Sequence, residues 1–424
     1  MLDPRQLREK RDAILESCRQ RRIQADVDGA ITEYEKLSAM LTESNEMNRR
    51  RNDHQKSGNR PMSDAERTAH AEAGRKLKDD AAGLDDRIRE QRSLLESKMM
   101  QLPNFIHPDV PIGGEEDYRV VKPGTPPEFG FKPLDHLALA EKHNLLDFEA
   151  GARVAGQKWY YLKNEAVLLD LALTRFALDL LLEEGFTPTV TPDVAKPDVV
   201  QNIGFTPRGE ETQIYSIEGH DLCLIGTAEI TLGGMLGDRI VDESELPIRL
   251  AGISHCFRTE AGSHGRESRG LYRVHQFTKT EMFVFCRPED SDAELEKLRC
   301  IEEKVFDALE FPYQVIDVAS GDLGAPAYRK YDLEAWMPGR GESGGWGEVT
   351  STSNCTDFQA RRLQSRFRRE GKKKPELLHT LNGTAISNAR ALLALLEIHQ
   401  QPDGSIAIPK ALIPYVGRDR IGTD

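Results

Sequence analysis

A stretch near the middle of the chain, residues 256–285, holds the side chains best suited to chemistry. Its apolar ends flank a polar segment, 261–270, that contains three glycines, so it predicts two strands joined by a loop. Because side chains alternate between the faces of a strand, Arg258 and Glu260 should share one face. The second strand should present a ring, a cation and a carboxylate together: Phe277, Lys279 and Glu281. Such a surface could bind an anion and supply a base, and a solvated surface hairpin is the alternative.

Two later segments carry side chains that could bind phosphate or a metal ion. Arg390 follows 381–389 at the start of an apolar helix, where N–H groups and a guanidinium favour an anion such as phosphate. Glu348 and Ser351 offer a carboxylate and a hydroxyl, which are oxygen ligands that suit Mg²⁺. An ordinary ion pair at Arg390 and a polar strand end at Glu348 are the alternatives.

The elements that position these residues begin at about Leu134. Helices are expected at 164–183, 288–310 and about 387–400. Strands are expected at 221–229, 248–258, 271–286, 313–318 and 344–351, and the first of them carries Thr227, Ala228 and Glu229, where the acid could simply face solvent. Strands grouped with flanking helices, without βαβ alternation, indicate an α+β domain on an antiparallel sheet. The sequence has neither a P-loop nor a Rossmann fingerprint.

The first hundred residues predict a helical arm. Asp3 and Pro4 form an N-cap and a first-turn proline of a short helix that should end near Arg22. Apolar residues then recur at three- and four-residue steps on both sides of a turn at 56–61, and Ser63-Asp-Ala-Glu66 forms a capping box. Two such helices should pair as an antiparallel coiled coil over about 27–101, with a seam that thins towards the turn.

The charges of this arm leave two functions open. Residues 1–100 carry 21 Lys and Arg against 20 Asp and Glu, whereas the whole chain has a formal net charge of −13. Cations spread along a rod suit contacts with phosphates. They are Arg49, Arg50, Arg51, Arg60, Arg75, Lys76, Lys78, Arg87, Arg89 and Arg92. A spacer or dimerisation arm with a solvated charged surface is the alternative.

Composition bounds the class of protein. Prolines and glycines crowd residues 103–133, which predicts a linker between two domains, 1–107 and 108–424. The acidic balance argues against nucleic-acid binding through bulk positive charge. The six cysteines lack C-x-x-C spacing, so no zinc ribbon or redox pair is indicated. Without an apolar leader or an 18-residue apolar run, a cytoplasmic protein that does not span a membrane is expected.

The central stretch closely resembles motif 2 of class II aminoacyl-tRNA synthetases, in the form found in seryl-tRNA synthetases. The Phe-Arg-x-Glu, the run Arg-Gly-Leu-Tyr-Arg-Val-His-Gln-Phe and the following Glu carry the likeness. Other segments match in order: motif 1 at about 164–192, motif 2 at about 248–285, Glu-Val-Thr-Ser with Asp-Phe-Gln-Ala-Arg-Arg at 348–362, and motif 3 at about 377–400. The chain is therefore identified as a member of this family, of the zinc-independent bacterial and eukaryotic type.

The resemblance implies an activity and its partners. The enzyme would activate L-serine with ATP and Mg²⁺ to seryl-adenylate and pyrophosphate, then transfer serine to tRNA(Ser), with tRNA(Sec) left open. The coiled-coil arm would reach the long variable arm of the tRNA. The loop at 261–270, with Arg266 and Arg269, would touch its acceptor end. Motif 1 would form a homodimer.

The resemblance also assigns roles to residues. The catalytic residues would be Arg258 between the serine carboxylate and the α-phosphate, Arg390 on the γ-phosphate, and Glu348, which with Ser351 would hold Mg²⁺. ATP would contact Arg258, Thr259, Glu260, Val274, Phe277, Glu348, Val349, Thr350, Ser351 and Arg390. Serine would contact Thr227, Ala228, Glu229, Arg258, Glu281, Asn382 and Thr384. No zinc is expected.

Departures from the usual pattern keep other activities open. Residues 383–389 read Gly-Thr-Ala-Ile-Ser-Asn-Ala where bacterial members usually have Gly-Ser-Gly-Leu-Ala, so Ala385 and Ala389 should tighten the floor of the ATP site. Gly226 stands where proline is common, and Thr352 replaces a frequent cysteine. A paralogue that serves as an aminoacyl-carrier ligase, or as a non-catalytic RNA-binding protein, is the alternative. A zinc-dependent pocket would need a cysteine ligand, for which Cys223 and Cys256 are near enough in sequence.

Overall fold

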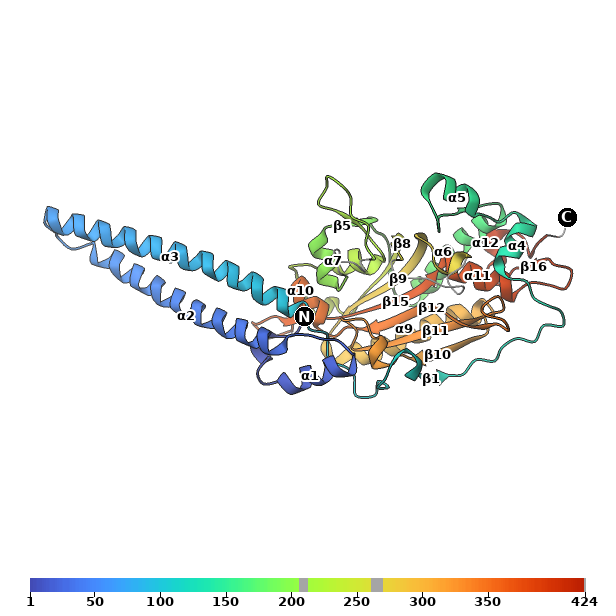
Figure 1. Ribbon diagram of the computed structural model, residues 1–424, viewed down its shortest axis with the longest axis horizontal. Coiled ribbons are helices and arrows are strands. Elements are labelled where there is room, and N and C mark those ends of the chain that lie inside the picture. The colour runs from blue at the N-terminus through green and yellow to red at the C-terminus, as the bar shows by residue number, and fades with distance from the viewer. Residues whose placement is uncertain (206–212, 261–269, 423–424) are drawn as a thin grey trace. The chain divides into compact units, whose positions relative to one another are not determined.

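The structure is a computed structural model that describes residues 1–205, 213–260 and 270–422. It divides into two compact units, Met1–Phe105 and Ile106–Asp424 (Figure 1). In the described part of the chain, no helix is both long enough and apolar enough to cross a membrane.

The first unit is a helical hairpin on a small base. Its elements are the 3-10 turn η1 (Pro4–Gln6), α1 (Arg11–Gln20), α2 (Val27–Ser57) and α3 (Asp64–Met99). The Asp3 carboxylate caps only the 3-10 turn, so the single helix expected from Pro4 was wrong and the α-helix begins seven residues later. The capping box is confirmed, because the Ser63 hydroxyl accepts from the Glu66 N–H and the Glu66 carboxylate accepts from the Ser63 N–H.

The seam between α2 and α3 is apolar only near the base of the hairpin. Buried Ala30, Ile31 and Leu37 of α2 and Leu84 and Ile88 of α3 belong to it. None of the residues 38–80, all of which the structure describes, is buried, which confirms the thinning seam. Near the turn the imidazoles of His54 and His70 stack with their centres 3.8 Å apart.

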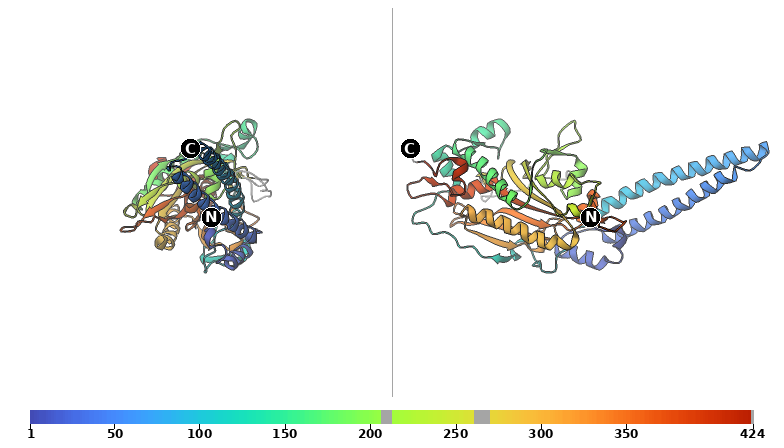
Figure 2. Two further views of the ribbon diagram at one scale, coloured as in Figure 1. Left: turned by 90° about the vertical axis from the view of Figure 1, so that its left-hand side faces the viewer. Right: turned by 180° about the vertical axis from the view of Figure 1, so that it is seen from behind.

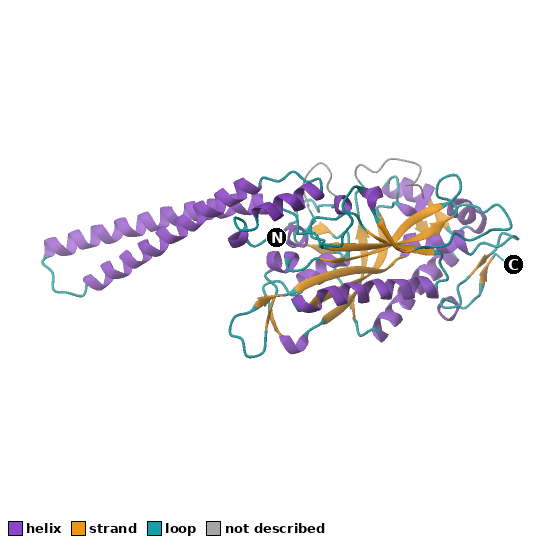
Figure 3. Ribbon diagram, turned by 90° about the horizontal axis from the view of Figure 1, so that it is seen from below, coloured by secondary structure: helices purple, strands orange, loops and turns teal. Residues whose placement is uncertain are grey.

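A mixed sheet forms the centre of the second unit (Figure 3). Among the described residues it has eight strands, in the order β1 (Arg119–Lys122), β10 (Tyr313–Asp317), β11 (Arg329–Met337), β12 (Gly345–Asn354), β15 (His379–Ser387), β9 (Gln276–Cys286), β8 (Ile248–Phe257) and β4 (Thr187–Val190). All neighbours are antiparallel except β4 and β8, which run parallel. The predicted α+β class on a largely antiparallel sheet is confirmed.

Helices and small sheets surround this central sheet. The helices are α4 (His136–His143), α5 (Phe148–Ala155), α6 (Glu165–Glu183), α7 (Pro197–Ile203), α8 (Ala228–Gly234), α9 (Ser291–Ala308), α10 (Phe358–Leu363), α11 (Asn388–Ile398) and α12 (Ile413–Val416). The short strands are β2 (Leu146–Asp147) with β3 (Tyr161–Leu162), β5 (Val194–Ala195) with β6 (Cys223–Leu224), β16 (Ile406–Ala407) with β17 (Arg420–Ile421), and β14 (Glu376–Leu377) with β13 (Arg366–Arg368) and β7 (Ile240–Asp242). Figure 2 shows α9 lying along one face of the central sheet.

Three predictions about these elements were wrong. The stretch 103–133 is not only a linker, because β1 within it pairs with β10 at one edge of the sheet. The strand β11 was not predicted, although it lies inside the sheet between β10 and β12. Thr227 to Glu229 do not lie on a strand, since the Thr227 hydroxyl caps α8 by accepting from the Glu229 N–H at 3.2 Å.

A buried acid on α9 lies behind the sheet. Glu302 is fully buried, and its carboxyl accepts from the Thr350 hydroxyl of β12 at 3.3 Å. Burial, with the carboxylates of Asp332 and Glu281 nearby, raises the pKa of Glu302 well above its ordinary value. The side chain therefore stays neutral in the folded protein at neutral pH.

Replacing this acid by its neutral isostere should stabilise the protein at neutral pH. A carboxyl whose pKa is raised by folding gives full stability below about pH 4.5 and loses about 1.4 kcal/mol per pH unit as the pH rises towards the folded pKa. Glu302→Gln should remove that slope, so urea unfolding of variant and wild type should diverge between pH 4.5 and 7.5. The control Glu303→Gln, which loses an ion pair with Lys122 at 2.8 Å, should give no gain. Parallel stability curves for Glu302→Gln and wild type would contradict this expectation.

Candidate active site

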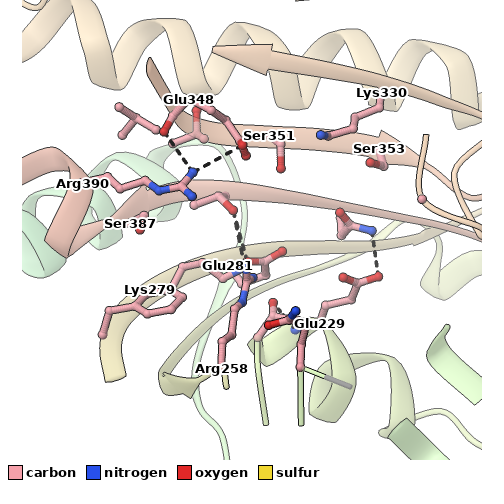
Figure 4. Close-up of a pocket in the computed structure, with 18 of the residues that line it drawn as sticks. Glu229, Arg258, Lys279, Glu281, Lys330, Glu348, Ser351, Ser353, Ser387 and Arg390 are labelled. Carbon is pink, nitrogen blue, oxygen red and sulfur yellow. Dashed lines mark hydrogen bonds and ion pairs between the residues drawn. The ribbon is translucent and has the colours of Figure 1, made fainter. Parts of the chain in front are cut away.

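A cavity of about 710 Å³ opens within the second unit (Figure 4). Its walls come from the ends of β8 and β9, from β12 and β15, and from the first turns of α8 and α11. Fourteen of the predicted site residues line it: Thr227, Glu229, Arg258, Glu260, Val274, Phe277, Glu281, Glu348, Val349, Thr350, Ser351, Asn382, Thr384 and Arg390. Thr259 and Ala228 are not among the described lining residues, and Ala228 is fully buried in the core. Arg266 and Arg269 lie outside the described residues.

Arg258 does not lie on the strand that was predicted to hold it. β8 ends at Phe257, and Arg258 and Glu260 follow it, with Glu260 in the left-handed region at φ +50°. The Arg258 Nε donates to the Gly226 carbonyl at 3.2 Å, and its guanidinium carbon lies 5.4 Å from the centre of the Phe277 ring. A cation held against an aromatic face by one hydrogen bond keeps its other N–H groups for an anion.

Arg390 and Glu348 form an ion pair at the opposite wall. The Arg390 Nη1 donates to the Glu348 carbonyl at 2.9 Å and lies 3.4 Å from its carboxylate. The guanidinium also stacks 4.7 Å from the centre of the Tyr272 ring. Burial opposes ionisation of Glu348, yet the cations Arg390, Lys330 and Arg258 outweigh it and lower the pKa of its carboxyl to about 2.

A β-bulge brings Glu348 and Ser351 to the same wall. Residues three apart on a regular strand point to opposite faces. Here Leu333 pairs with Thr350 and Glu334 pairs with Glu348, so Val349 is an extra residue in β12. Both side chains therefore line the cavity.

The far end of the cavity is acidic. The Glu229 carboxylate accepts from Asn382 Nδ2 at 2.9 Å and from Gln359 Nε2 at 2.7 Å. Burial and the neighbouring Glu281 carboxylate raise its pKa to about 7. Glu281 is itself buried in an ion pair with Lys279, and its carboxylate lies 3.4 Å from the Thr384 hydroxyl.

The unusual alanines of the last segment lie in different surroundings. Thr384 pairs with Glu281 and Ile386 with Thr280, so Ala385 is the extra residue of a bulge in β15, and it is fully buried. Ala389 lines the cavity beside Arg390. The expectation that both alanines form the floor of the site therefore holds for Ala389 alone.

The sequences of known proteins identify the family. Residues 1–106 match the seryl-tRNA synthetase N-terminal domain, and residues 213–399 match the class II tRNA synthetase core domain for G, H, P, S and T. A serine–tRNA ligase from Treponema denticola is 50% identical over the full length of both chains, and one from Rhodopirellula baltica is 54% identical over 99% of each. The chain belongs to the seryl-tRNA synthetase family. It is thus a class II aminoacyl-tRNA synthetase, as the motif resemblance predicted.

Solved structures of this seryl-tRNA synthetase family have the same fold. The enzyme from Pyrococcus horikoshii, complexed with ATP, is 37% identical, with a TM-score of 0.88 and 99% of each chain covered. The cytoplasmic enzyme from Naegleria fowleri, in complex with AMP, is 31% identical, with a TM-score of 0.84 over 99% of this chain and 98% of that one.

Several lining residues of this family member had no role assigned from its sequence. Lys279 was placed on the correct strand face but its pairing with Glu281 was not foreseen. Lys330, on the unpredicted strand β11, is held 2.9 Å from Asp332. Ser353, Ser387 and Tyr272 also line the cavity. Their signal in the sequence was only that polar residues recur on strands, which is common in any sheet.

Proposed function

We propose that this chain activates L-serine with ATP to form seryl-adenylate and pyrophosphate, and then transfers the seryl group to tRNA(Ser). The observation that carries the proposal is the division of one cavity into a cationic wall and an acidic end. Figure 4 shows Glu348 and Arg390 together, apart from Glu229. Arg258 and Glu281 lie between those two ends. The printed names of the relatives and the ATP and AMP in the two solved structures support the same activity.

The chemistry asks mainly for charge neutralisation and alignment. The serine carboxylate attacks the α-phosphate in line, and pyrophosphate leaves. Arg258 lies where it would contact both anions, which otherwise repel each other, and Arg390 would hold the γ-phosphate. Phe277, already against the Arg258 guanidinium, would stack on the adenine.

The acidic end suits the amino and hydroxyl groups of serine. Glu229, Glu281 and Thr384 offer acceptors and a hydroxyl within a small volume. A pocket that pairs with a substrate hydroxyl rejects alanine, because its buried polar groups would be left without partners.

Glu348 and Ser351 fit a magnesium ion that travels with ATP. Both are oxygen donors on one wall, and the low pKa of Glu348 keeps it ionised. Bound there, Mg²⁺ would neutralise the phosphate charge that develops as pyrophosphate leaves. Among the described residues, no group of three or more His, Cys, Asp or Glu is arranged to hold a metal ion by itself.

Glu348→Gln should therefore weaken the response to magnesium. The amide keeps the size of the side chain but loses the charge, so the Mg²⁺ concentration for half-maximal pyrophosphate exchange should rise by about tenfold, the scale of one lost charge-assisted contact. Titration of MgCl₂ at saturating ATP and serine measures it. The control Glu334→Gln, on the adjacent strand and outside the described lining, should leave the titration unchanged. An unaltered titration for Glu348→Gln would remove Glu348 from the metal site.

The partners follow from two surfaces. Exposed arginines along α2 and α3 would contact the phosphates of the tRNA variable arm. On α6, Leu168 and Leu171 are exposed, as is Val190 on the edge strand β4, where it is 80% exposed. A second copy of the chain would cover this apolar surface, as expected for a homodimer through motif 1. Sedimentation of an active monomer would contradict the dimer.

Charging of tRNA tests the whole proposal. The purified protein, incubated with ATP, Mg²⁺, labelled serine and a tRNA(Ser) transcript, should yield seryl-tRNA, in the cytoplasmic reducing conditions proposed for it. A carrier-protein ligase would instead form adenylate without charging any tRNA. A non-catalytic RNA-binding paralogue would retain the transcript without forming either product.

A further inference from the structure

Gln359 lies just behind the acidic end of the cavity. It occupies the first turn of α10, is fully buried, and is not among the residues that line the cavity. Nothing in the activity assigned above requires this residue. Its hydrogen bonds, however, join three elements that meet at the acidic end.

The amide of Gln359 is fully used and has a fixed orientation. Its Nε2 donates to the Glu229 carboxylate at 2.7 Å and to the Ile203 carbonyl at 2.8 Å, and its Oε1 accepts from the Thr380 hydroxyl at 2.7 Å. Rotating the amide by 180° would set its oxygen against a carboxylate and a carbonyl, both of which only accept. The side chain therefore acts as a two-way clamp between α7, α8 and β15.

This clamp determines which oxygen of Glu229 is available. Gln359 and Asn382 both donate to Oε1. Within the described part of the chain, no hydrogen bond to Oε2 is present, so Oε2 is the atom left for a ligand. Hydrogen bonds to an ionised carboxylate favour its charged form.

The charge of Glu229 is finely balanced. Burial and the carboxylate of Glu281 raise its pKa, whereas the hydrogen bond from Gln359 and the cations Lys279 and Arg258 lower it, and the result is about 7. These are the charged groups that face Glu229 from β9 and from the end of β8. Loss of the Gln359 bond should shift this balance towards the neutral acid.

We propose that Gln359 is a positioning residue that holds the Glu229 carboxylate as an ionised acceptor for the amino-acid substrate, and so sets the affinity for serine. The proposal rests on the proposed function, because it assumes that serine occupies the acidic end. It concerns the amino acid alone and leaves ATP binding unaffected. Gln359 acts through Glu229 and need not touch the substrate.

The test compares two variants in serine-dependent pyrophosphate exchange between pH 6 and 9. Gln359→Met removes both donors, so the KM for serine at pH 7 should rise about tenfold, the scale of one hydrogen bond to a charged group, with the KM for ATP unchanged. The KM for serine should recover as the pH rises, because Glu229 then ionises without help. Gln359→Glu should behave oppositely: protonated at low pH it can still donate to Glu229, and ionised at high pH it repels it.

A matched control separates this role from loss of stability. Gln314 is also buried and donates to a carboxylate, Glu334, at 2.7 Å, but neither residue is among the described lining residues. Gln314→Met should leave the KM for serine and its pH dependence unchanged. The proposal is overturned if the Gln359 variants and the Gln314 variant have the same pH profile. A wild-type protein without serine-dependent exchange would instead overturn the proposed function, and Gln359→Glu, which keeps the bond from Thr380, provides the measurement if Gln359→Met does not fold.

Discussion

Replacement of Arg258 by alanine is expected to slow serine-dependent pyrophosphate exchange by about 10²- to 10³-fold, the usual cost of losing a principal charge-stabilising group. Attack of one anion on another needs a cation between them, and Arg258 is positioned for that by the Gly226 carbonyl and the Phe277 ring. Arg390 lies at the other wall, paired with Glu348, and cannot take its place. The measurement is the exchange rate at saturating ATP and serine.

Two further variants make this result specific. Arg258→Lys keeps the charge but loses the planar fork, so its activity should lie between those of the wild type and the alanine variant. Arg249, on the same strand, is bonded to Glu294 at 2.9 Å and is not among the described lining residues, so Arg249→Ala removes a buried ion pair without touching the cavity. If Arg249→Ala lost as much activity as Arg258→Ala, the defect would be one of folding and not of catalysis.

Shortening the helical arm should abolish charging of tRNA while amino-acid activation remains. Joining Lys36 to Ile88 through a Gly-Ser turn removes the outer arm but keeps the base, where Gln91 Nε2 donates to the Glu33 carboxylate at 2.6 Å. Charging should fall by roughly 10³-fold or more, because several phosphate contacts are lost together. Pyrophosphate exchange should stay near the wild-type rate, since the cavity lies entirely in the second unit.

A milder variant tests the physical basis of the arm's role. Arg49, Arg50 and Arg51 are exposed on α2, and replacing all three by alanine should lower the salt dependence of tRNA binding by a slope of about 3, or about 0.9 for each phosphate contact. If the shortened enzyme charged tRNA normally, the arm would be a spacer, the alternative that its charges had left open.

The arm could be predicted well because its signals are local. The capping box at Ser63 and Glu66 and the spacing of apolar residues each depend on neighbours within one or two helical turns. The first helix was placed too early because Asp3 and Pro4 suit the start of a 3-10 turn as well as that of an α-helix. Local sequence does not distinguish the two.

The sheet was less predictable because its order depends on residues far apart in sequence. The strand β11 begins with Arg329, Lys330 and Tyr331 and lacks a clear apolar alternation, and it is fixed by pairing with β10 and β12. The bulge at Val349 is visible only in that pairing, yet it alone explains how Glu348 and Ser351 share a wall.

The candidate site shows the same division. Residues carried by the motif resemblance, such as Arg258, Glu281 and Arg390, were found from the sequence and all line the cavity. Gln359 belongs to a motif that was noticed, but its role depends on Glu229, which lies 130 positions earlier in the chain. Hydrogen bonds of that kind leave no pattern in a single sequence.

The measurement that tests the central claim most directly is amino-acid-dependent exchange of pyrophosphate into ATP by the purified protein. Serine, threonine, alanine, glycine and cysteine would be compared at equal concentration without tRNA. The account predicts exchange with serine well above that with the other four, because only serine offers both a hydroxyl and a fitting size to the Glu281 and Thr384 end. Absence of exchange with serine, or equal exchange with alanine, would contradict it.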